Sequence, residues 1–193
     1  MKRSHSPLAI ALALAAALPF AASAAEGVSY NYVQGGYVAT NGGGADADGF
    51  GVDGSVAIHP NFHLFGGYAN QELDNSNFDF DQWRVGFGYN LEVSPRADLL
   101  ARLAYEKFDA GRDFFGNRIE ADGYSVEVGV RSALTSNLEG HALAGYEDYG
   151  RNADDFYGRL GAQYKFNPRW GISGDVKFAD GDTQWFVGPR LTW

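Results

Sequence analysis

The sequence contains no cysteine, no apolar run long enough for a membrane helix, and few basic residues. Without Cys the chain has neither disulfides nor a thiolate metal or redox site. Its longest unbroken apolar stretch, residues 8–18, is shorter than the about 20 residues that a transmembrane helix needs. With 15 Lys and Arg against 24 Asp and Glu, the net charge of −9 argues against a nucleic-acid partner.

What the chain does contain is glycine and aromatic side chains: 26 Gly, 14 Phe, 11 Tyr and 4 Trp among 193 residues. A hydrophobic content of 45% is too high for a disordered chain, although the mean hydropathy is negative at −0.28. The length fits a single domain.

The N-terminus has the three regions of a signal peptide. Lys2 and Arg3 precede the apolar stretch, Pro19 ends it, and Ala22-Ser23-Ala24 is a small-x-small cleavage site. The alternative, an apolar core helix, does not explain this order. We therefore expect residues 1–24 to be removed during export and residues 25–193 to form the mature domain.

Beyond Ala25 the apolar residues recur at every second position, which indicates strands. In one segment, Trp83, Val85, Phe87 and Tyr89 alternate with Gln82, Arg84, Gly86 and Gly88. Ten such segments are expected, each near the about 9–11 residues of a tilted membrane strand: 28–39, 49–59, 62–71, 80–90, 97–108, 122–133, 138–149, 156–166, 170–179 and 183–193. The first is the weakest, because Gly35-Gly36 interrupts it and the apolar phase shifts there.

Aromatic residues mark both ends of the apolar face. One set is Trp83, Tyr105, Tyr124, Tyr146, Phe156, Phe178 and Trp185; the other is Phe62, Tyr89, Tyr164, Phe166, Trp170 and Trp193. A bilayer favours two such girdles around an aliphatic band, whereas a soluble β-sandwich does not require them. The sequence therefore predicts an all-β fold, a transmembrane antiparallel up-and-down β-barrel of ten strands, with eight strands as the alternative.

The connections alternate between short turns and longer acidic segments. The turns are His59-Pro60-Asn61, Ser94-Pro95-Arg96, Thr135-Ser136-Asn137 and Asn167-Pro168-Arg169; the longer segments are 40–49, 72–81, 109–122, 148–155 and 180–182. The longer segments hold 15 acidic and 3 basic residues, a net charge of −12. Since long loops of such barrels face outward, we expect an acidic extracellular crown. Asp46-Ala47-Asp48-Gly49 and Asp180-Gly181-Asp182 lack the distal Glu of a calcium loop, so we expect solvated acidic side chains there. A looser hypothesis is that divalent ions bridge the crown to lipopolysaccharide phosphates.

The inward face carries charges of both signs. They are Arg84, Arg102, Glu106, Glu127, Arg131, Arg159, Asp175 and Arg190, with Asp53, Glu139, Glu147, Lys165 and Lys177. Interleaved signs favour a filled polar lumen held by ion pairs; a selective pore is the alternative.

No constellation of nucleophile, base and orienting group is apparent. His59 and His63 are expected at a periplasmic turn, and His141 lies alone on the inward face of its strand. We predict no catalytic residue, cofactor or metal, and an outer-membrane hydrolase stays as a second alternative.

Three stretches resemble a known family: residues 61–68 (NFHLFGGY), 94–102 (SPRADLLAR) and 178–190 (FADGDTQWFVGPR). They are similar to the small outer-membrane proteins of xanthomonads, whose founding member was described as an activator of a rice immune receptor. The resemblance implies an outer-membrane barrel linked to motility, biofilm, virulence and outer-membrane vesicles. It also implies that the segment from Ala25 to about Thr40 is a proposed signalling peptide, a different segment from the export signal, with Tyr30 as the modified tyrosine.

We therefore expect a non-enzymatic protein of the Gram-negative outer membrane that acts in surface structure and interaction, such as adhesion or host recognition. A narrow porin-like channel is the first alternative. The expected partners are the lipid bilayer and lipopolysaccharide, periplasmic chaperones, the barrel-assembly machinery and a host surface receptor.

The C-terminus generates a prediction, because Val187, Pro189, Leu191 and Trp193 form an alternating apolar ending. Such an ending, with Leu191 and the terminal aromatic Trp193, is the expected assembly signal. Removing Trp193 should strongly reduce the amount of folded barrel in the outer membrane. Cold-versus-boiled gel mobility measures that amount, and an unchanged level of heat-modifiable protein would contradict the assignment.

Overall fold

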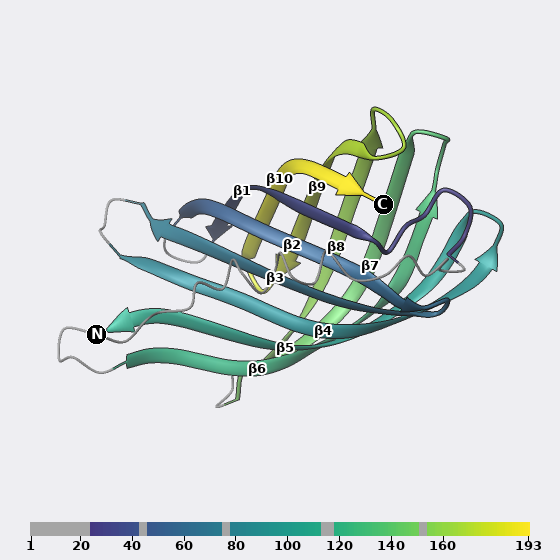
Figure 1. Cartoon of the computed structure of the whole chain (residues 1–193). Coiled ribbons are helices and arrows are strands. Elements are labelled where there is room, and N and C mark those ends of the chain that lie inside the picture. The colour runs from purple at the N-terminus through teal and green to yellow at the C-terminus, as the bar shows by residue number, and fades with distance from the viewer. Residues whose placement is uncertain (1–23, 43–45, 75–77, 113–117, 151–153) are drawn as a thin grey trace, which may run out of the picture.

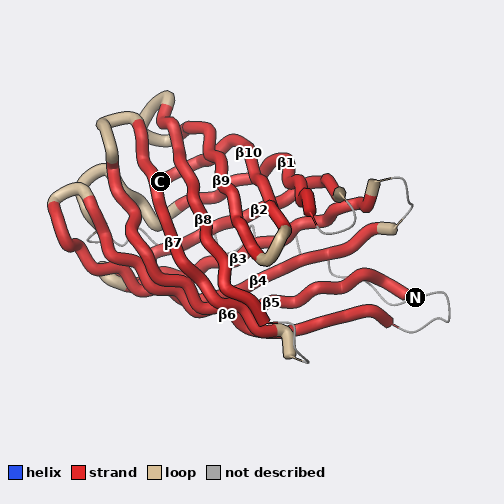
Figure 2. Tube along the Cα trace, turned by 180° about the vertical axis from the view of Figure 1, so that it is seen from behind, coloured by secondary structure: helices blue, strands red, loops and turns tan. Residues whose placement is uncertain are grey.

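A computed structural model of the chain describes residues 24–42, 46–74, 78–112, 118–150 and 154–193, and shows a closed antiparallel barrel (Figures 1 and 2). The strands are β1 (Tyr32–Gly42), β2 (Ala47–His59), β3 (Phe62–Leu73), β4 (Asp79–Ser94), β5 (Ala97–Arg112), β6 (Arg118–Ala133), β7 (Leu138–Asp148), β8 (Asp154–Lys165), β9 (Trp170–Ala179) and β10 (Asp182–Thr192). Each pairs with the next, and β1 pairs with β10. The prediction of ten strands is confirmed, and the eight-stranded alternative is wrong.

The two-residue period determines which side chains point outward. On β6, Val126 and Val128 are exposed, whereas Ser125 and Glu127, which alternate with them, are buried. The apolar face is therefore the outer surface and the polar face the lumen. No helix suited to crossing a bilayer occurs in the part of the chain that the structure describes.

The two ends of the barrel differ. The turn end has the connections after β2, β4, β6 and β8; the loop end has those after β1, β3, β5, β7 and β9. Strands extend further toward the loop end than expected: β5 ends at Arg112 and β6 begins at Arg118, where residues 109–122 were predicted to form a loop. Asp109, Glu120 and Asp122 thus lie on paired strands. The crown residues Asp113 and Arg151, and most of the predicted signal peptide, lie outside the described residues.

The first strand corrects the prediction most. It was expected over 28–39 and is observed from Tyr32 to Gly42. Tyr32 and Val38 are both buried on the lumen side and Tyr37 is exposed, so the expected shift of phase at Gly35-Gly36 does not occur. The sequence suggests a shift because Tyr32, although aromatic, points inward, where its hydroxyl donates to Asp53 Oδ1 over 3.1 Å.

Glycine allows the closing seam between β1 and β10 to form. A Cβ on Gly188 would overlap the Gly35 carbonyl oxygen, and one on Gly36 would overlap that of Val187. The backbones of the first and last strands can approach only because both positions lack a side chain. Closure leaves no unpaired strand edge, which a sheet in lipid requires.

This seam makes a testable prediction. Gly188→Ala should lower the free energy of unfolding by about 1–3 kcal/mol, the usual cost of overpacking. Gly158→Ala is the matched control, because nothing lies within 4 Å of a Cβ there. Urea unfolding in detergent, followed by tryptophan fluorescence, measures both. Equal stability of the two variants would contradict the close approach.

Candidate functional site

The lumen collects the charged side chains that alternate with the apolar outer face. The structure places all eight predicted network residues there: Arg84 on β4, Arg102 and Glu106 on β5, Glu127 and Arg131 on β6, Arg159 on β8, Asp175 on β9 and Arg190 on β10. They do not form one chain of contacts but separate clusters along the barrel axis.

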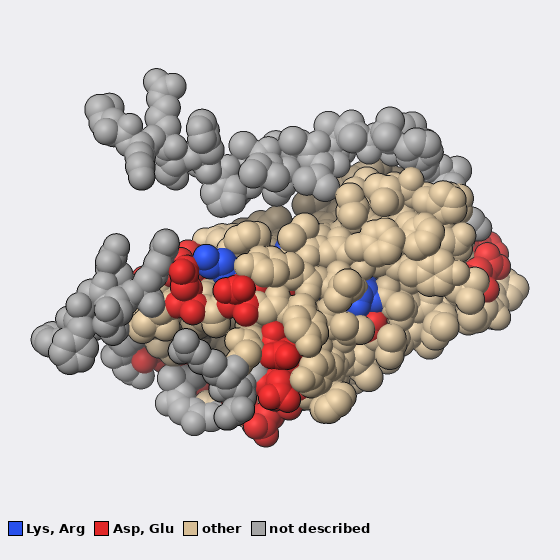
Figure 3. All heavy atoms as spheres, turned by 90° about the horizontal axis from the view of Figure 1, so that it is seen from below, with Lys and Arg blue, Asp and Glu red and all other residues tan. Residues whose placement is uncertain are grey.

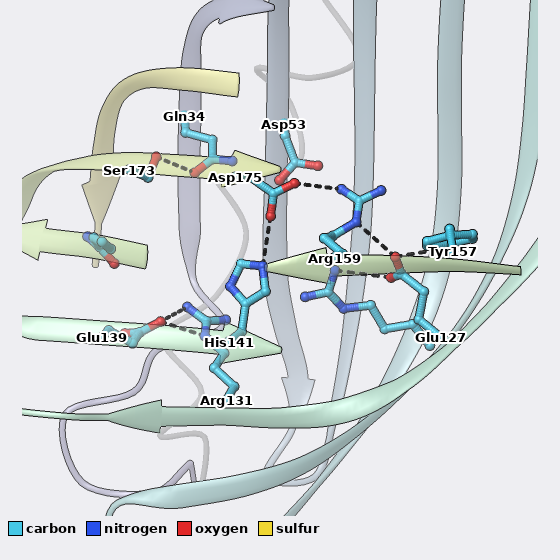
Figure 4. Close-up of polar contacts among 12 residues, drawn as sticks. Gln34, Asp53, Glu127, Arg131, Glu139, His141, Tyr157, Arg159, Ser173 and Asp175 are labelled. Atoms are coloured by element: carbon cyan, nitrogen blue, oxygen red, sulfur yellow. Dashed lines mark hydrogen bonds and ion pairs between the residues drawn. The ribbon is translucent and has the colours of Figure 1, made fainter. Parts of the chain in front are cut away.

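The central cluster is built around Glu127, which is 2% exposed (Figure 4). Arg102 Nη1 lies 3.5 Å from its Oε2, and Arg159 Nε lies 3.1 Å from its Oε1. The Tyr157 hydroxyl also donates to Oε1 over 3.0 Å. One carboxylate from β6 thus links a guanidinium group of the adjacent strand β5 with one of β8, two strands away, inside the lumen.

Arg159 extends this cluster to β9. Its Nη1 donates to Asp175 Oδ1 over 3.1 Å, and Asp175 Oδ2 lies 2.8 Å from His141 Nε2. His141 therefore belongs to the polar network, as its inward position predicted. Among the described side chains no hydroxyl hydrogen-bonds to this imidazole, so the hydrolase alternative finds no nucleophile beside it.

A second cluster lies nearer the turn end and centres on Glu139 of β7. Arg131 Nε and Nη2 both lie 2.5 Å from its Oε1, Lys165 Nζ lies 3.2 Å from Oε2, and Arg190 Nη1 lies 4.0 Å from Oε1. The Arg190 guanidinium also stacks over the Tyr32 ring at 3.9 Å. Three cations share one carboxylate, and the aromatic ring provides a further favourable contact.

Toward the loop end the contacts are more open. Lys177 donates to Glu147 Oε2 over 2.5 Å, and Arg84 Nη2 lies 3.7 Å from Asp53 Oδ2. The Tyr149 hydroxyl, beyond the end of β7, donates to Glu106 Oε2 over 3.0 Å. Burial, followed by the nearby carboxylates of Glu106 and Glu147, raises the pKa of Tyr149 above its ordinary value, so it is a neutral donor here.

The space between these clusters is a cavity of about 460 Å³. It extends from Arg131 and Glu139 near the turn end to Phe108, Tyr149 and Gln184 near the loop end. Its walls mix charges, amides and aromatic rings. Within the described ranges, no group of three or more His, Asp or Glu is arranged to hold a metal ion.

Residues 24–31 fold across the turn end, which the sequence did not predict. Tyr30 stacks on His63 with ring centroids 4.5 Å apart and packs in an apolar cluster with Ala25, Val28, Ala57, Leu100, Ala133 and Leu143. The Arg131 guanidinium lies 4.9 Å from the Tyr30 ring on its lumen side. This cluster, named here the turn-end plug, lies at the turn end of the lumen, below the Glu139 cluster.

His63 and Asp98, two buried residues of this region, could be found from the sequence only by extending the inward-outward alternation of β3 and β5 to the turn end. His63 was expected at the turn, but it lies on β3 and is 1% exposed. Asp98 continues the inward series that contains Leu100 and Arg102, and it is 0% exposed. His59, by contrast, is exposed at the end of β2, beside the turn, and its Nδ1 accepts from the Asn61 amide over 3.3 Å.

On the face seen in Figure 3, the outer surface is mostly uncharged between the two ends, and large hydrophobic side chains such as Val85 and Leu103 are exposed on the outward face. Of the two expected aromatic girdles, eleven of the thirteen side chains are exposed, including Trp83 and Trp185 in one and Trp170 and Trp193 in the other. Tyr146 and Phe62 are half-buried because they pack on neighbouring rings. Acidic side chains gather beyond the apolar band at the loop end, with a smaller group at the turn end (Figure 3).

The sequence profile of the outer membrane protein β-barrel domain matches residues 10–186. No curated protein sequence matches the chain. Similar solved structures include a KdgM porin in complex with disordered oligogalacturonate, at 11% identity, a TM-score of 0.45 and coverage of 86% of this chain and 99% of the porin. Neisserial surface protein A is 20% identical with a TM-score of 0.40, and the match covers 86% of this chain and 98% of that protein. The transport unit of the autotransporter AIDA-I from Escherichia coli is 12% identical with a TM-score of 0.46, and the match covers 96% of this chain and 97% of that unit.

The Glu127 cluster makes a prediction about stability. Glu127→Gln leaves Arg102 and Arg159 facing one another without their shared carboxylate, and breaking a buried pair costs about 3–5 kcal/mol of unfolding free energy. Glu92→Gln on exposed β4 surface is the control and should change it by less than about 0.5 kcal/mol. Urea unfolding compares them. A similar small change in both would mean that water, not Glu127, solvates these guanidinium groups.

Proposed function

The chain belongs to the outer membrane protein β-barrel domain family, and from this premise we propose that it is a plugged, non-enzymatic barrel that acts at the cell surface through its loop end. Surface structure and interaction, including adhesion, biofilm formation and host recognition, are the roles proposed. The single observation that carries the proposal is the set of ion-pair clusters in the lumen with the turn-end plug below them, which we take to close it.

The closure supports a structural barrel over an open pore. The Glu127 cluster joins β5, β6 and β8 through the lumen, and the Glu139 cluster joins β6, β7, β8 and β10 below it. In small barrels the interior is filled by side chains. An ion entering from the loop end would meet both clusters and then the apolar cluster around Tyr30.

The orientation proposed places the turn end in the periplasm, because bacterial barrels have short periplasmic turns and longer outer loops. The acidic loop end then faces the medium. Acidic side chains there, including Asp46, Asp74 and Asp180, are exposed. Such a surface favours cationic partners or partners reached through divalent ions.

The outer wall fits the proposed lipid partners. Near the loop end, outward tyrosines donate to carboxylates on the next strand: Tyr68 to Asp81 over 2.6 Å and Tyr124 to Asp148 over 3.2 Å. These polar tips border the apolar band at the level of the outer leaflet headgroups. Lipopolysaccharide is the proposed partner there, and export chaperones and the barrel-assembly machinery are the partners proposed for the unfolded chain.

A narrow passive channel is the second candidate, favoured by the cavity of about 460 Å³ inside the barrel. It would require the ion pairs or the turn-end plug to move aside. The two candidates therefore differ in whether the barrel conducts ions.

Planar-bilayer recording tests the proposal. The purified protein should insert without discrete conductance steps, because both clusters and the plug obstruct the lumen. Glu127→Gln probes the obstruction, and Val126→Ala on the lipid-facing side of the same strand is the matched control. Discrete openings of the unaltered protein, changed in size by Glu127→Gln and not by Val126→Ala, would replace the plugged barrel with the channel.

A further inference from the structure

Asp98 differs from the other buried acids of the barrel. Four acidic side chains are buried in the described part of the chain: Asp98, Glu127, Glu139 and Glu147. The last three each have at least one Lys or Arg nitrogen within 4.0 Å. Asp98 has only neutral partners among the described residues, although a buried carboxylate is costly unless it is paired with a cation.

The neutral partners of Asp98 come from the N-terminal segment. The Tyr30 hydroxyl donates to Oδ2 over 3.0 Å, and the Ala25 backbone nitrogen donates to Oδ1 over 3.1 Å. Ala25 is itself 1% exposed. Arg131 lies opposite Asp98 in the β5–β6 register, but its guanidinium nitrogens bind Glu139 on the far side.

The chain around Ala25 is held in place by further contacts. The Glu26 amide donates to the Pro95 carbonyl over 2.8 Å, and the Val28 amide donates to the Ala25 carbonyl over 3.0 Å. Lys165 Nζ donates to the Gly27 carbonyl, and Gly27 has a φ of +82° that favours glycine at this turn. These contacts place the Ala25 nitrogen beside Asp98 without requiring a charge on that nitrogen.

From this geometry we propose that Asp98 is a receptor for the free amino terminus of the mature chain, the α-ammonium group of Ala25. The inference rests on the cleavage predicted after Ala24 and is independent of whether the lumen conducts. Hydrolysis of the Ala24–Ala25 peptide bond by a signal peptidase adds one water: Ala24 leaves as a carboxylate, and the Ala25 nitrogen becomes an –NH₃⁺ group. The neutral amide donor at Asp98 is thereby replaced by a cation at the same atom.

Processing would therefore complete the turn-end plug. An ion pair between Ala25 and Asp98 ties the first mature residue to β5, and Tyr30, bound to the other carboxylate oxygen, brings the plug residues into the same unit. In an uncleaved chain the same position would hold an amide, so that no cation would be bonded to Asp98. Around this position, Glu92 of β4 and Arg131 of β6 lie opposite Asp98 in the register, His63 of β3 stacks on Tyr30, and Lys165 of β8 donates to the Gly27 carbonyl.

The test uses mature protein purified from outer membranes in detergent. Intact-mass measurement should first show that the chain starts at Ala25. The rate at which an amine-acylating reagent labels this α-amine is then measured across pH 6–10, in folded and in urea-unfolded protein. An opposite charge favours the ammonium by about 1–3 pKa units, so the folded protein should label about tenfold or more slowly at neutral pH.

The pH profile separates pairing from simple burial in the unaltered protein alone. An ion pair raises the pKa of the α-amine above its ordinary range of about 7.7–8.0, whereas burial without a partner lowers it. Asp98→Asn should abolish that rise. Glu147→Gln, which removes a buried carboxylate nearer the loop end, should leave it unchanged, and gel mobility checks that both variants fold.

Three results would overturn the proposal: a mature chain that starts at another residue, an unshifted or lowered pKa of the α-amine in folded protein, or an equal rise in Asp98→Asn. Should Asp98→Asn fail to fold, the pH profile of the unaltered protein decides alone. None of these results depends on bilayer conductance, so the failure of this inference and the failure of the plugged-barrel proposal are distinguishable.

Discussion

The architecture depends on one constraint: in hydrocarbon, backbone N–H and C=O groups have no water to bind, so the sheet must pair all of them internally. A closed barrel meets this requirement only if the first and last strands pair, which β1 and β10 do from Tyr32–Thr192 to Gly42–Asp182. Once the sheet closes, the pleat divides each strand into a lipid face and a lumen face. The polar half of the sequence then has no place except the lumen and the two ends.

Placing charges in the lumen creates a second requirement, because each must find a counter-charge within a narrow space. The sequence meets it by distributing signs over different strands: Glu127 on β6 serves Arg102 on β5 and Arg159 on β8. Glu127 thereby links β6 to its neighbour β5 and to β8, two strands away, on the lumen side of the sheet. The cavity runs between these clusters to the loop end, where the Tyr149 hydroxyl contacts Glu106.

The period of the sequence was enough to predict the fold class, the number of strands and the inward face. It predicted that the eight network residues, of which Arg84 is the first and Arg190 the last, lie in the lumen, because alternation is a local property of each strand. It did not predict the loop-end extensions of β5 and β6, since positions such as Asp109 and Glu120, which continue the outward face there, are acidic and not apolar. Pairing continues there because the ladder itself, beyond the apolar band, needs no apolar face.

The N-terminal segment was missed for a different reason. Val28, Tyr30 and Tyr32 alternate as a strand would, yet only Tyr32 lies in β1. The contacts that turn the chain away from the sheet all come from residues distant in sequence. These residues are Pro95 in the turn before β5, Asp98 on β5, His63 on β3 and Lys165 on β8. No local pattern encodes them.

The plug draws on strands that are apart in the barrel. Tyr30 stacks on His63 of β3 and packs with Ala133 of β6, while Lys165 of β8 donates to the Gly27 carbonyl. Only the curved sheet brings these strands to one place, so residues that alternate like a strand in the sequence lie as a cap on the assembled barrel.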